Sequence, residues 1–167
     1  MNNFYLYKAK EKNTGKWITG FYAYKKETTY CFKQDYEKYP VKKIHYIIQD
    51  CMTDWGLPNT LRQIEVDGNT LCRGTGLKNK NGELLWEHDV VACEDDDSVV
   101  SVIKWDNENA RFVLEDYGYD EDDGKFMKFD YNSFDNFISF DDWAITIGNE
   151  IDASLQELQN VLGGTTV

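Results

Sequence analysis

The chain has 167 residues, of which 41% are hydrophobic and 15% aromatic, enough apolar material for the core of one compact domain. Its formal net charge is −12, and so acidic a surface repels phosphate backbones, so no direct nucleic-acid binding is expected of the chain as a whole. No run of 18 apolar residues occurs, and the N-terminal residues lack the apolar stretch of an export signal. We therefore expect a cytoplasmic protein without membrane contact.

The charge is unevenly distributed along the chain. Residues 1–50 contain ten Lys and five Asp or Glu, a net +5, whereas the remainder carries −17. This polarity would allow the basic part of one copy to meet the acidic part of another, so the sequence is compatible with a homo-oligomer.

The cysteines do not form a metal-binding pattern. Cys31, Cys51, Cys72 and Cys93 lie about twenty residues apart without a C-x-x-C pair, and the chain has only two histidines. We expect no metal and no other cofactor, and reduced thiols of which most are buried.

The first fifty residues are predicted to form a sheet. Aromatic and β-branched residues at 4–9 and 17–24 flank the polar stretch KEKNTGK, which predicts a hairpin. Further strands are expected at residues 28–32 and 44–50, with an exposed, lysine-rich connection between them. His45 falls within the second of these strands, where a hydrogen-bonded sheet histidine is expected rather than a ligand.

An irregular segment follows at residues 51–60, because it contains Gly56 and Pro58. We interpret it as a seam within a single domain, between an N-terminal sub-sheet over residues 1–55 and a core over about 60–151.

The later strands are predicted from alternation and turn signals. Residues 62–74 are expected to form two short strands around Asp67-Gly68, and residues 98–106 and 110–116 a hairpin across the turn NEN. Residues 133–140 have the spacing of a short helix, and residues 144–151 that of a last strand.

A terminal helix over about 154–162 is predicted by a capping box. Ser154 can accept a free backbone N–H while Glu157 reaches back to the backbone of Ser154. Leu155, Leu158 and Leu162 share one face, and Gly163-Gly164 ends the helix. We expect this helix to cap the sheet; a partner-binding helix is the alternative.

Residues 75–91, TGLKNKNGELLWEHDVV, resemble the signature of the YopX-like proteins, approximately TGLKDKNGKEIYEGDIV. Three further blocks resemble the family in the same order: FYLYKAKEKNTGKWITGFY, VIKWDNENARFVL, and AITIGNEI before a helix. These proteins are encoded by phages and prophages of Gram-positive bacteria. The resemblance implies a mainly β (β-rich α+β) fold, a small pseudobarrel of antiparallel strands capped by a C-terminal helix, with an N-terminal sheet extension. It implies a protein acting in a bacterial host, without an established catalytic activity.

The signature residues are interpreted as structural. Asn81-Gly82 predicts a tight turn with positive φ angles, and Asp89 can accept backbone N–H groups before Val90 enters a buried strand. The signature set comprises Thr75, Gly76, Leu77, Asn81, Gly82, Trp86, Glu87, Asp89, Val90, Gly148 and Asn149.

The sequence departs from the family pattern at two places. His88 stands where the family has Gly, which would cost on the order of 1 kcal/mol if the backbone keeps a positive φ. Cys72-Arg73-Gly74 stands where an aromatic residue usually precedes the signature.

No catalytic residues are expected. Glu87 and Asp89 flank His88, but adjacent residues of an extended chain point to opposite faces, so neither easily orients the imidazole. A pair of Cys93 with His88 is conceivable, but this spacing carries no recognised geometry of a nucleophile and its base. The stretch YDEDDGKF fails the EF-hand pattern, because Tyr119 would take the first ligand position. A hydrolase or nucleic-acid-processing enzyme around His88 is the less favoured alternative.

The function favoured by the sequence is that of a non-enzymatic phage accessory protein, a protein-interaction module with a host or phage partner of unknown identity. The alternative is an acidic mimic of DNA that inhibits a host nucleic-acid-binding or defence protein. Its carboxylates would come from the acidic stretches EDDD and EDYGYDEDD and from Asp130, Asp135, Asp141 and Asp142.

Overall fold

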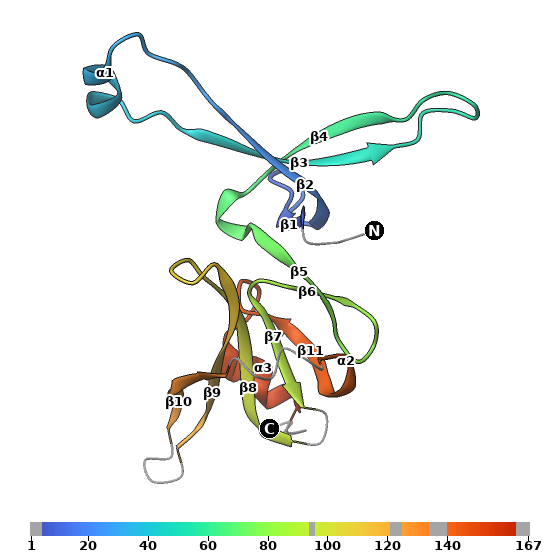
Figure 1. The fold of residues 1–167 in the computed structure, drawn as a ribbon, viewed down its shortest axis with the longest axis vertical. Helices are drawn as coiled ribbons and strands as arrows, with labels where there is room; N and C mark the ends of the chain where they lie inside the picture. The colour runs from blue at the N-terminus through green and yellow to red at the C-terminus, as the bar shows by residue number, and fades with distance from the viewer. Residues whose placement is uncertain (1–4, 94–95, 121–124, 134–139, 163–167) are drawn as a thin grey trace. The chain divides into compact units, whose positions relative to one another are not determined.

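The computed structural model describes residues 5–93, 96–120, 125–133 and 140–162 (Figure 1). Strands hold 55% of the described residues and helices 14%, and the strands form two antiparallel sheets. The mainly β class is therefore confirmed. Contacts divide the chain into two compact units, Tyr5–Arg73 and the part from Gly74 onward, which are described separately below.

The unit Tyr5–Arg73 contains an antiparallel sheet with the strand order β4-β3-β2-β1. Its strands are β1 (Leu6–Lys10), β2 (Trp17–Lys26), β3 (Lys43–Cys51) and β4 (Thr60–Val66). The predicted first hairpin is confirmed, because β1 pairs with β2 across a turn in which Gly15 has φ +69°. β5 (Cys72–Lys78) begins in this unit, where Cys72 and Arg73 pair with β1.

The prediction of a strand at residues 28–32 is wrong. β2 pairs directly with β3, and the chain between them leads into a short helix, α1 (Lys33–Lys38), which has no buried residue. Phe32 is 71% exposed, so the segment has no apolar face to bury against a neighbouring strand. The residues of α1, KQDYEK, are mostly good helix formers.

The core of this unit is small and lies on one face of the sheet. Ala9, Ile47 and Val66 are buried, with four partly buried side chains around them: Tyr7, Ile18, Tyr22 and Leu71. A single bridge, Glu11 with Val66, joins the ends of β1 and β4. The short helix η2 (Gly68–Thr70) follows. This sheet is open, since one bridge does not close its two edges. Neither of the two sheets closes into a barrel, so the pseudobarrel expected over about 60–151 is wrong.

The unit from Gly74 onward contains a second antiparallel sheet, in the order β10-β9-β8-β7-β11. Its strands are β7 (Asp89–Cys93), β8 (Asp96–Asp106), β9 (Arg111–Tyr119), β10 (Phe126–Ser133) and β11 (Ala144–Asn149). The predicted β8–β9 hairpin is confirmed over eight residue pairs. β6 (Leu84–Trp86) pairs with the later part of β5.

Both faces of this second sheet are covered by buried apolar residues. One cluster comprises Leu85, Val91, Ile103, Leu114 and Ala144, and the other Val90, Ala92, Val100, Val102 and Leu158. β7 and β8 contribute to both clusters, as the alternation of side chains along a strand requires.

Two helices accompany this sheet, α2 (Phe140–Trp143) and α3 (Leu155–Leu162). The predicted capping box of α3 is confirmed, because Ser154 N–H donates to Glu157 Oε2 at 2.9 Å. A Cβ at Gly148 would lie 2.5 Å from Leu158 Cδ2, so glycine lets α3 approach β11. The helix predicted at 133–140 falls largely on residues 134–139, which lie outside the described residues, as do Gly163-Gly164.

The cysteines differ from expectation, because only Cys72 is buried. Cys51 and Cys93 are half-buried at strand ends, and Cys31 is exposed in the loop before α1. All four are free thiols. Among the described residues, no helix has the length and apolar character needed to cross a membrane.

Candidate functional site

The signature segment forms a hydrogen-bonded turn between β5 and β6. The hydroxyl of the buried Thr75 donates to Leu85 O at 2.8 Å. Asn79, which is fully buried, accepts from the N–H groups of Asn81 and Glu83 with its side-chain oxygen. Positive φ occurs at Gly82 and not at Asn81, so the predicted turn needs only one such angle. The sequence reasoning missed Asn79, whose spacing of two residues before Asn81 is typical of an Asx turn.

A second buried polar pair joins the β6–β7 turn to β11. Asp89 accepts from Trp86 N–H at 2.9 Å and from the Asn149 amide at 3.0 Å. Asn149 in turn accepts from Ile151 N–H at 3.0 Å. Asp89 thus binds two other signature residues, the nearby Trp86 and the distant Asn149, and these polar groups stabilise the turn.

His88 adopts the left-handed backbone conformation, with φ +70°. Its N–H donates to Ile103 O at 2.7 Å and its carbonyl accepts from Glu150 N–H at 3.1 Å, so the strained residue is held from both sides. Its Nδ1 contacts Glu150 Oε1, which also contacts the Lys104 ammonium. The imidazole is therefore oriented by a carboxylate 62 residues away. The neighbouring Glu87 lies farther off, with 3.9 Å between its Oε1 and His88 Nε2.

The electrostatics of this cluster are those of an ion pair. Burial opposes ionisation of Glu150, but hydrogen bonds from His88 and Lys104 outweigh it, so the pKa of this carboxyl lies below its ordinary value.

Burial, together with nearby Glu115, raises the pKa of Tyr117 to about 12, so its phenol stays protonated at neutral pH.

This cluster lacks the features of a nucleophile–base site. Glu150 is shared between the Lys104 ammonium and the His88 imidazole, and the ammonium neutralises it rather than leaving it poised as a base. Cys93 lies at the far end of β7, roughly 16 Å from His88 at the rise of an extended strand, so the two residues do not meet. Among the described residues, no group of three or more His, Cys, Asp or Glu side chains is placed to hold a metal ion.

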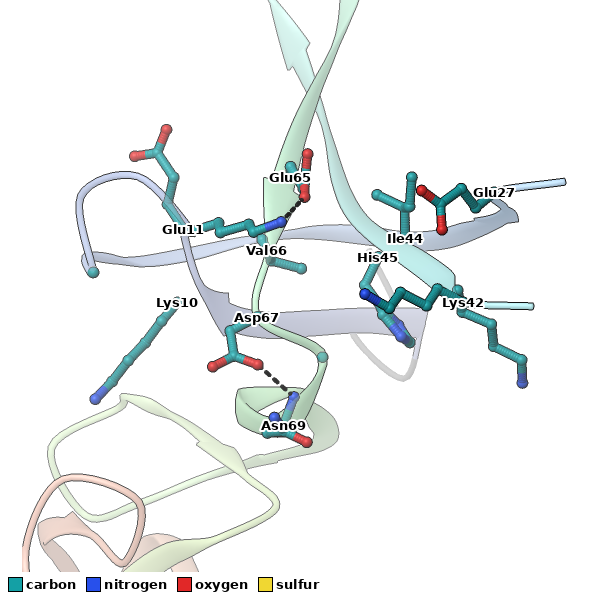
Figure 2. Close-up of a pocket in the computed structure, with 14 residues that line it drawn as sticks. Lys10, Glu11, Glu27, Lys42, Ile44, His45, Glu65, Val66, Asp67 and Asn69 are labelled. Atoms are coloured by element: carbon teal, nitrogen blue, oxygen red, sulfur yellow. Dashed lines mark hydrogen bonds and ion pairs between the residues drawn. The ribbon is translucent and has the colours of Figure 1, made fainter. Parts of the chain in front are cut away.

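A groove of about 930 Å³ lies within Tyr5–Arg73, beside His45 (Figure 2). His45 Nδ1 lies 2.8 Å from Tyr22 Oη, and a Cβ at Gly68 would come within 2.7 Å of the imidazole. Lys12 and Glu65, which both line the groove, form an ion pair. Lysines and carboxylates both line it, so it favours neither an anion nor a cation. Its lining also includes Lys10, Glu11, Glu27, Lys42, Lys43 and Asp67.

The most exposed apolar group of the described residues lies at the end of the β3–β4 hairpin. The hairpin projects from the sheet in Figure 1, and the chain reverses over residues 52–59. Trp55 is 91% exposed and Leu61 72%, and Met52 and Leu57 are also mostly exposed. We call these four side chains the hairpin tip. The sequence predicted an irregular segment here but not its exposure.

The backbone of the hairpin tip is held by its own hydrogen bonds. Asp54 accepts from Trp55 N–H at 2.7 Å, and the Thr53 hydroxyl donates to Pro58 O at 3.0 Å. The Asn59 amide donates to Asp50 at 3.0 Å. Gly56, with φ +78°, allows the reversal. The exposed indole is therefore presented on an ordered loop.

The protein is therefore a β-rich protein of two open antiparallel sheets. Its signature residues stabilise turns, and its most exposed apolar side chains lie at the hairpin tip. A family profile described as YopX protein matches residues 6–137, and the chain therefore belongs to this family. The resemblance noted in the sequence is thus confirmed, and it is consistent with a phage-type protein. A comparison with curated proteins finds no match.

Proposed function

We propose that this protein is a phage or prophage accessory protein that acts by binding another protein, without catalysing a reaction, and that the hairpin tip is its contact surface. The observation that carries the proposal is the exposure of Trp55 on an ordered loop, in a hairpin that also exposes three further apolar side chains. Tryptophan is enriched among the residues that dominate binding energy in protein interfaces. An ordered loop also loses little conformational entropy on binding.

The chemistry of the tip indicates what the partner offers. An indole and three aliphatic or thioether side chains fit an apolar pocket, and the pocket must exclude water to gain from their burial. Asp50 and Asp54 flank the tip, so a basic rim around that pocket would complement it. We therefore expect a host or phage protein with an apolar pocket bordered by Lys or Arg.

The test compares the full chain with two double variants as immobilised baits in a lysate of infected host cells. Trp55→Ser with Leu57→Ser removes the tip, and Tyr119→Ser with Met127→Ser removes two exposed apolar residues of the other unit. A protein retained by the wild type and the control variant but lost with the tip variant supports the proposal. Its purified form should bind the tip variant at least about 30-fold more weakly, since a hot-spot truncation costs about 2 kcal/mol or more.

Two results would contradict the proposal. Equal retention by the tip variant would exclude the hairpin tip as the contact surface. Turnover of a small molecule by the wild type, lost in His88→Ala, would instead support an enzyme centred on the His88 cluster.

An acidic mimic of DNA is the second candidate function, and the charge of the later unit favours it. From Gly74 onward the sequence has six Lys or Arg and 22 Asp or Glu, a net −16. A DNA-binding partner that duplex DNA displaces from this protein, and that binds the tip variant as tightly as the wild type, would favour mimicry over binding through the tip.

A further inference from the structure

Residues 24–46 form the other end of the sheet in Tyr5–Arg73, where β2 ends, α1 follows and β3 begins (Figure 1). We call this stretch the lysine–tyrosine end. It contains six lysines and three acidic residues, a net +3. It also contains six aromatic residues: Tyr24, Tyr30, Phe32, Tyr36, Tyr39 and Tyr46.

Four of the lysines lie over aromatic rings. The ammonium of Lys43 is 4.9 Å from the ring centroid of Tyr24, and that of Lys38 is 5.2 Å from Tyr39. Lys25 and Lys26 lie at 5.4 and 5.6 Å over the rings of Tyr46 and Tyr36, respectively. Among the described residues, none of these four ammonium groups forms an ion pair with a carboxylate. The four lysines are therefore held by rings rather than neutralised by carboxylates.

Two of these lysines face each other directly. Lys26 of β2 is the register partner of Lys43 of β3, so both side chains project from the same face of the sheet, next to Tyr24. Like charges in opposing positions destabilise a strand pair. An anion bound between the two ammonium groups would remove this repulsion.

The rings of this end are accessible as well. Phe32 is 71% exposed, Tyr24 and Tyr39 are each slightly more than half exposed, and α1 has no buried residue. Tyr30 packs edge-on against Tyr36, with 5.2 Å between ring centroids. Exposed rings beside lysines offer two kinds of contact, stacking and charge neutralisation.

The geometry points to single-stranded nucleic acid as the ligand of the lysine–tyrosine end. Its phosphates can contact the lysines while its unpaired bases stack on the rings, and stacking of this kind tolerates any base sequence. Duplex DNA presents no base faces, and an acidic peptide would use the lysines but not the rings. Carboxylates such as Glu65 and Asp67 line the groove of Figure 2, so the strand should follow the exposed rings rather than the groove.

The expectation that the chain does not bind nucleic acid rests on its whole charge of −12. Twelve Lys or Arg and eight Asp or Glu fall within Tyr5–Arg73, a net +4, so the negative charge belongs to the other unit. At physiological ionic strength exposed charges are screened beyond roughly 8 Å, and the charges nearest the ligand decide its binding. The affinity should be that of sequence-independent binding, with a dissociation constant of about 10⁻⁴–10⁻⁶ M.

The test measures fluorescence anisotropy of a labelled 15-nucleotide deoxythymidine strand titrated with the full chain at several salt concentrations. We expect Lys26→Gln with Lys43→Gln to weaken binding about 10-fold and to make the dependence of log K on log salt shallower by about 1.4, because each neutralised phosphate of a single strand contributes about 0.7. Lys78→Gln with Lys125→Gln is the matched control, since it changes the net charge equally at two exposed lysines of the other unit. This control should bind as the wild type does.

A second pair of variants tests the rings. Phe32→Leu with Tyr39→Leu should weaken binding at least about 5-fold without changing the salt dependence, because stacking is lost while the lysines remain. Circular dichroism and urea unfolding establish that each variant is folded.

Several results would overturn the proposal. Absence of binding at 100 μM protein would do so, as would equal loss of affinity in the Lys78 and Lys125 control. Binding of a polyglutamate peptide or a duplex as tight as that of the single strand would show charge attraction alone. A salt-sensitive dimer that forms without binding the strand would assign the surface to a second copy.

Discussion

The two units of this protein use their apolar residues in opposite ways. From Gly74 onward, ten buried residues in two clusters cover both faces of the β7–β8–β9 sheet, whereas in Tyr5–Arg73 three buried residues form a core on one face. Nine of the eleven exposed large hydrophobic side chains of the described residues belong to Tyr5–Arg73. All of the signature residues lie in the well-packed unit. The residues that identify the family are thus separate from the surfaces available for binding.

Truncation of a core residue should show the largest difference between the units. Leu114 of β9 is fully buried in the cluster that contains Leu85 and Ile103, so Leu114→Ala should lower the free energy of unfolding by about 2–5 kcal/mol. Leu61→Ala makes the same chemical change on the exposed face of β4 and should alter it by no more than about 0.5 kcal/mol. Urea unfolding measures both. Equal effects would mean that Leu61 is covered in solution.

A glycine of the smaller unit should be the next most sensitive position. A Cβ at Gly20 would lie 2.4 Å from the Ile48 carbonyl oxygen, a backbone atom that cannot turn away. Gly20→Ala should therefore destabilise Tyr5–Arg73 by about 1–3 kcal/mol. Hydrogen exchange should quicken in β2 and β3 and stay slow in β7–β9, and the exposed Thr19→Ala serves as control. Equal quickening in both units would show that they unfold together.

Substitutions of His88 test whether its backbone conformation stores strain in the well-packed unit. His88→Gly and His88→Ala both remove the imidazole from Glu150, but only alanine keeps a Cβ at φ +70°. The glycine variant should be more stable than the alanine variant by about 1 kcal/mol, because glycine adopts this conformation without strain. Thermal or urea unfolding compares them. Indistinguishable variants would place no backbone strain at this position.

The smallest expected effect is the dependence of stability on pH. The pKa of Glu150 is lowered in the folded protein, so the stabilisation from its ionised form is complete above its ordinary value of 4.5 and is lost as pH falls through the lower, folded value. The stability advantage of wild type over Glu150→Gln should therefore shrink between pH 6 and pH 3.5. Urea midpoints over this range measure it, with Glu108→Gln of the exposed β8–β9 turn as control. A constant advantage would contradict the role of the ion pair.

Local signals predicted much of this fold. The alternation of β8 and β9 and the capping box of α3 are both set by residues close in sequence, and both are confirmed. The strand predicted at 28–32 does not form, because its β-forming residues have no neighbouring strand to pair with. Propensity alone does not reveal this.

The arrangement of the site residues could not be predicted in the same way, because it depends on contacts between residues far apart in the sequence. Glu150 reaches His88 across 62 positions, and no spacing rule links them. The exposure of Trp55 depends on how far the hairpin extends beyond the core, which a composition of Trp, Gly and Pro does not fix. The sequence shows that the first fifty residues are rich in lysine. Which lysine lies over which tyrosine ring depends on the register of β2 and β3, which the sequence does not give.

The position of Trp55 gives the protein an intrinsic optical label. The other four tryptophans, Trp17, Trp86, Trp105 and Trp143, are all at least half-buried, so quenching by acrylamide should act first on the indole of Trp55. Its emission should lie toward longer wavelengths and shift to shorter ones when a partner removes it from water. Engagement of the hairpin could then be followed in unlabelled protein by the colour of its own fluorescence.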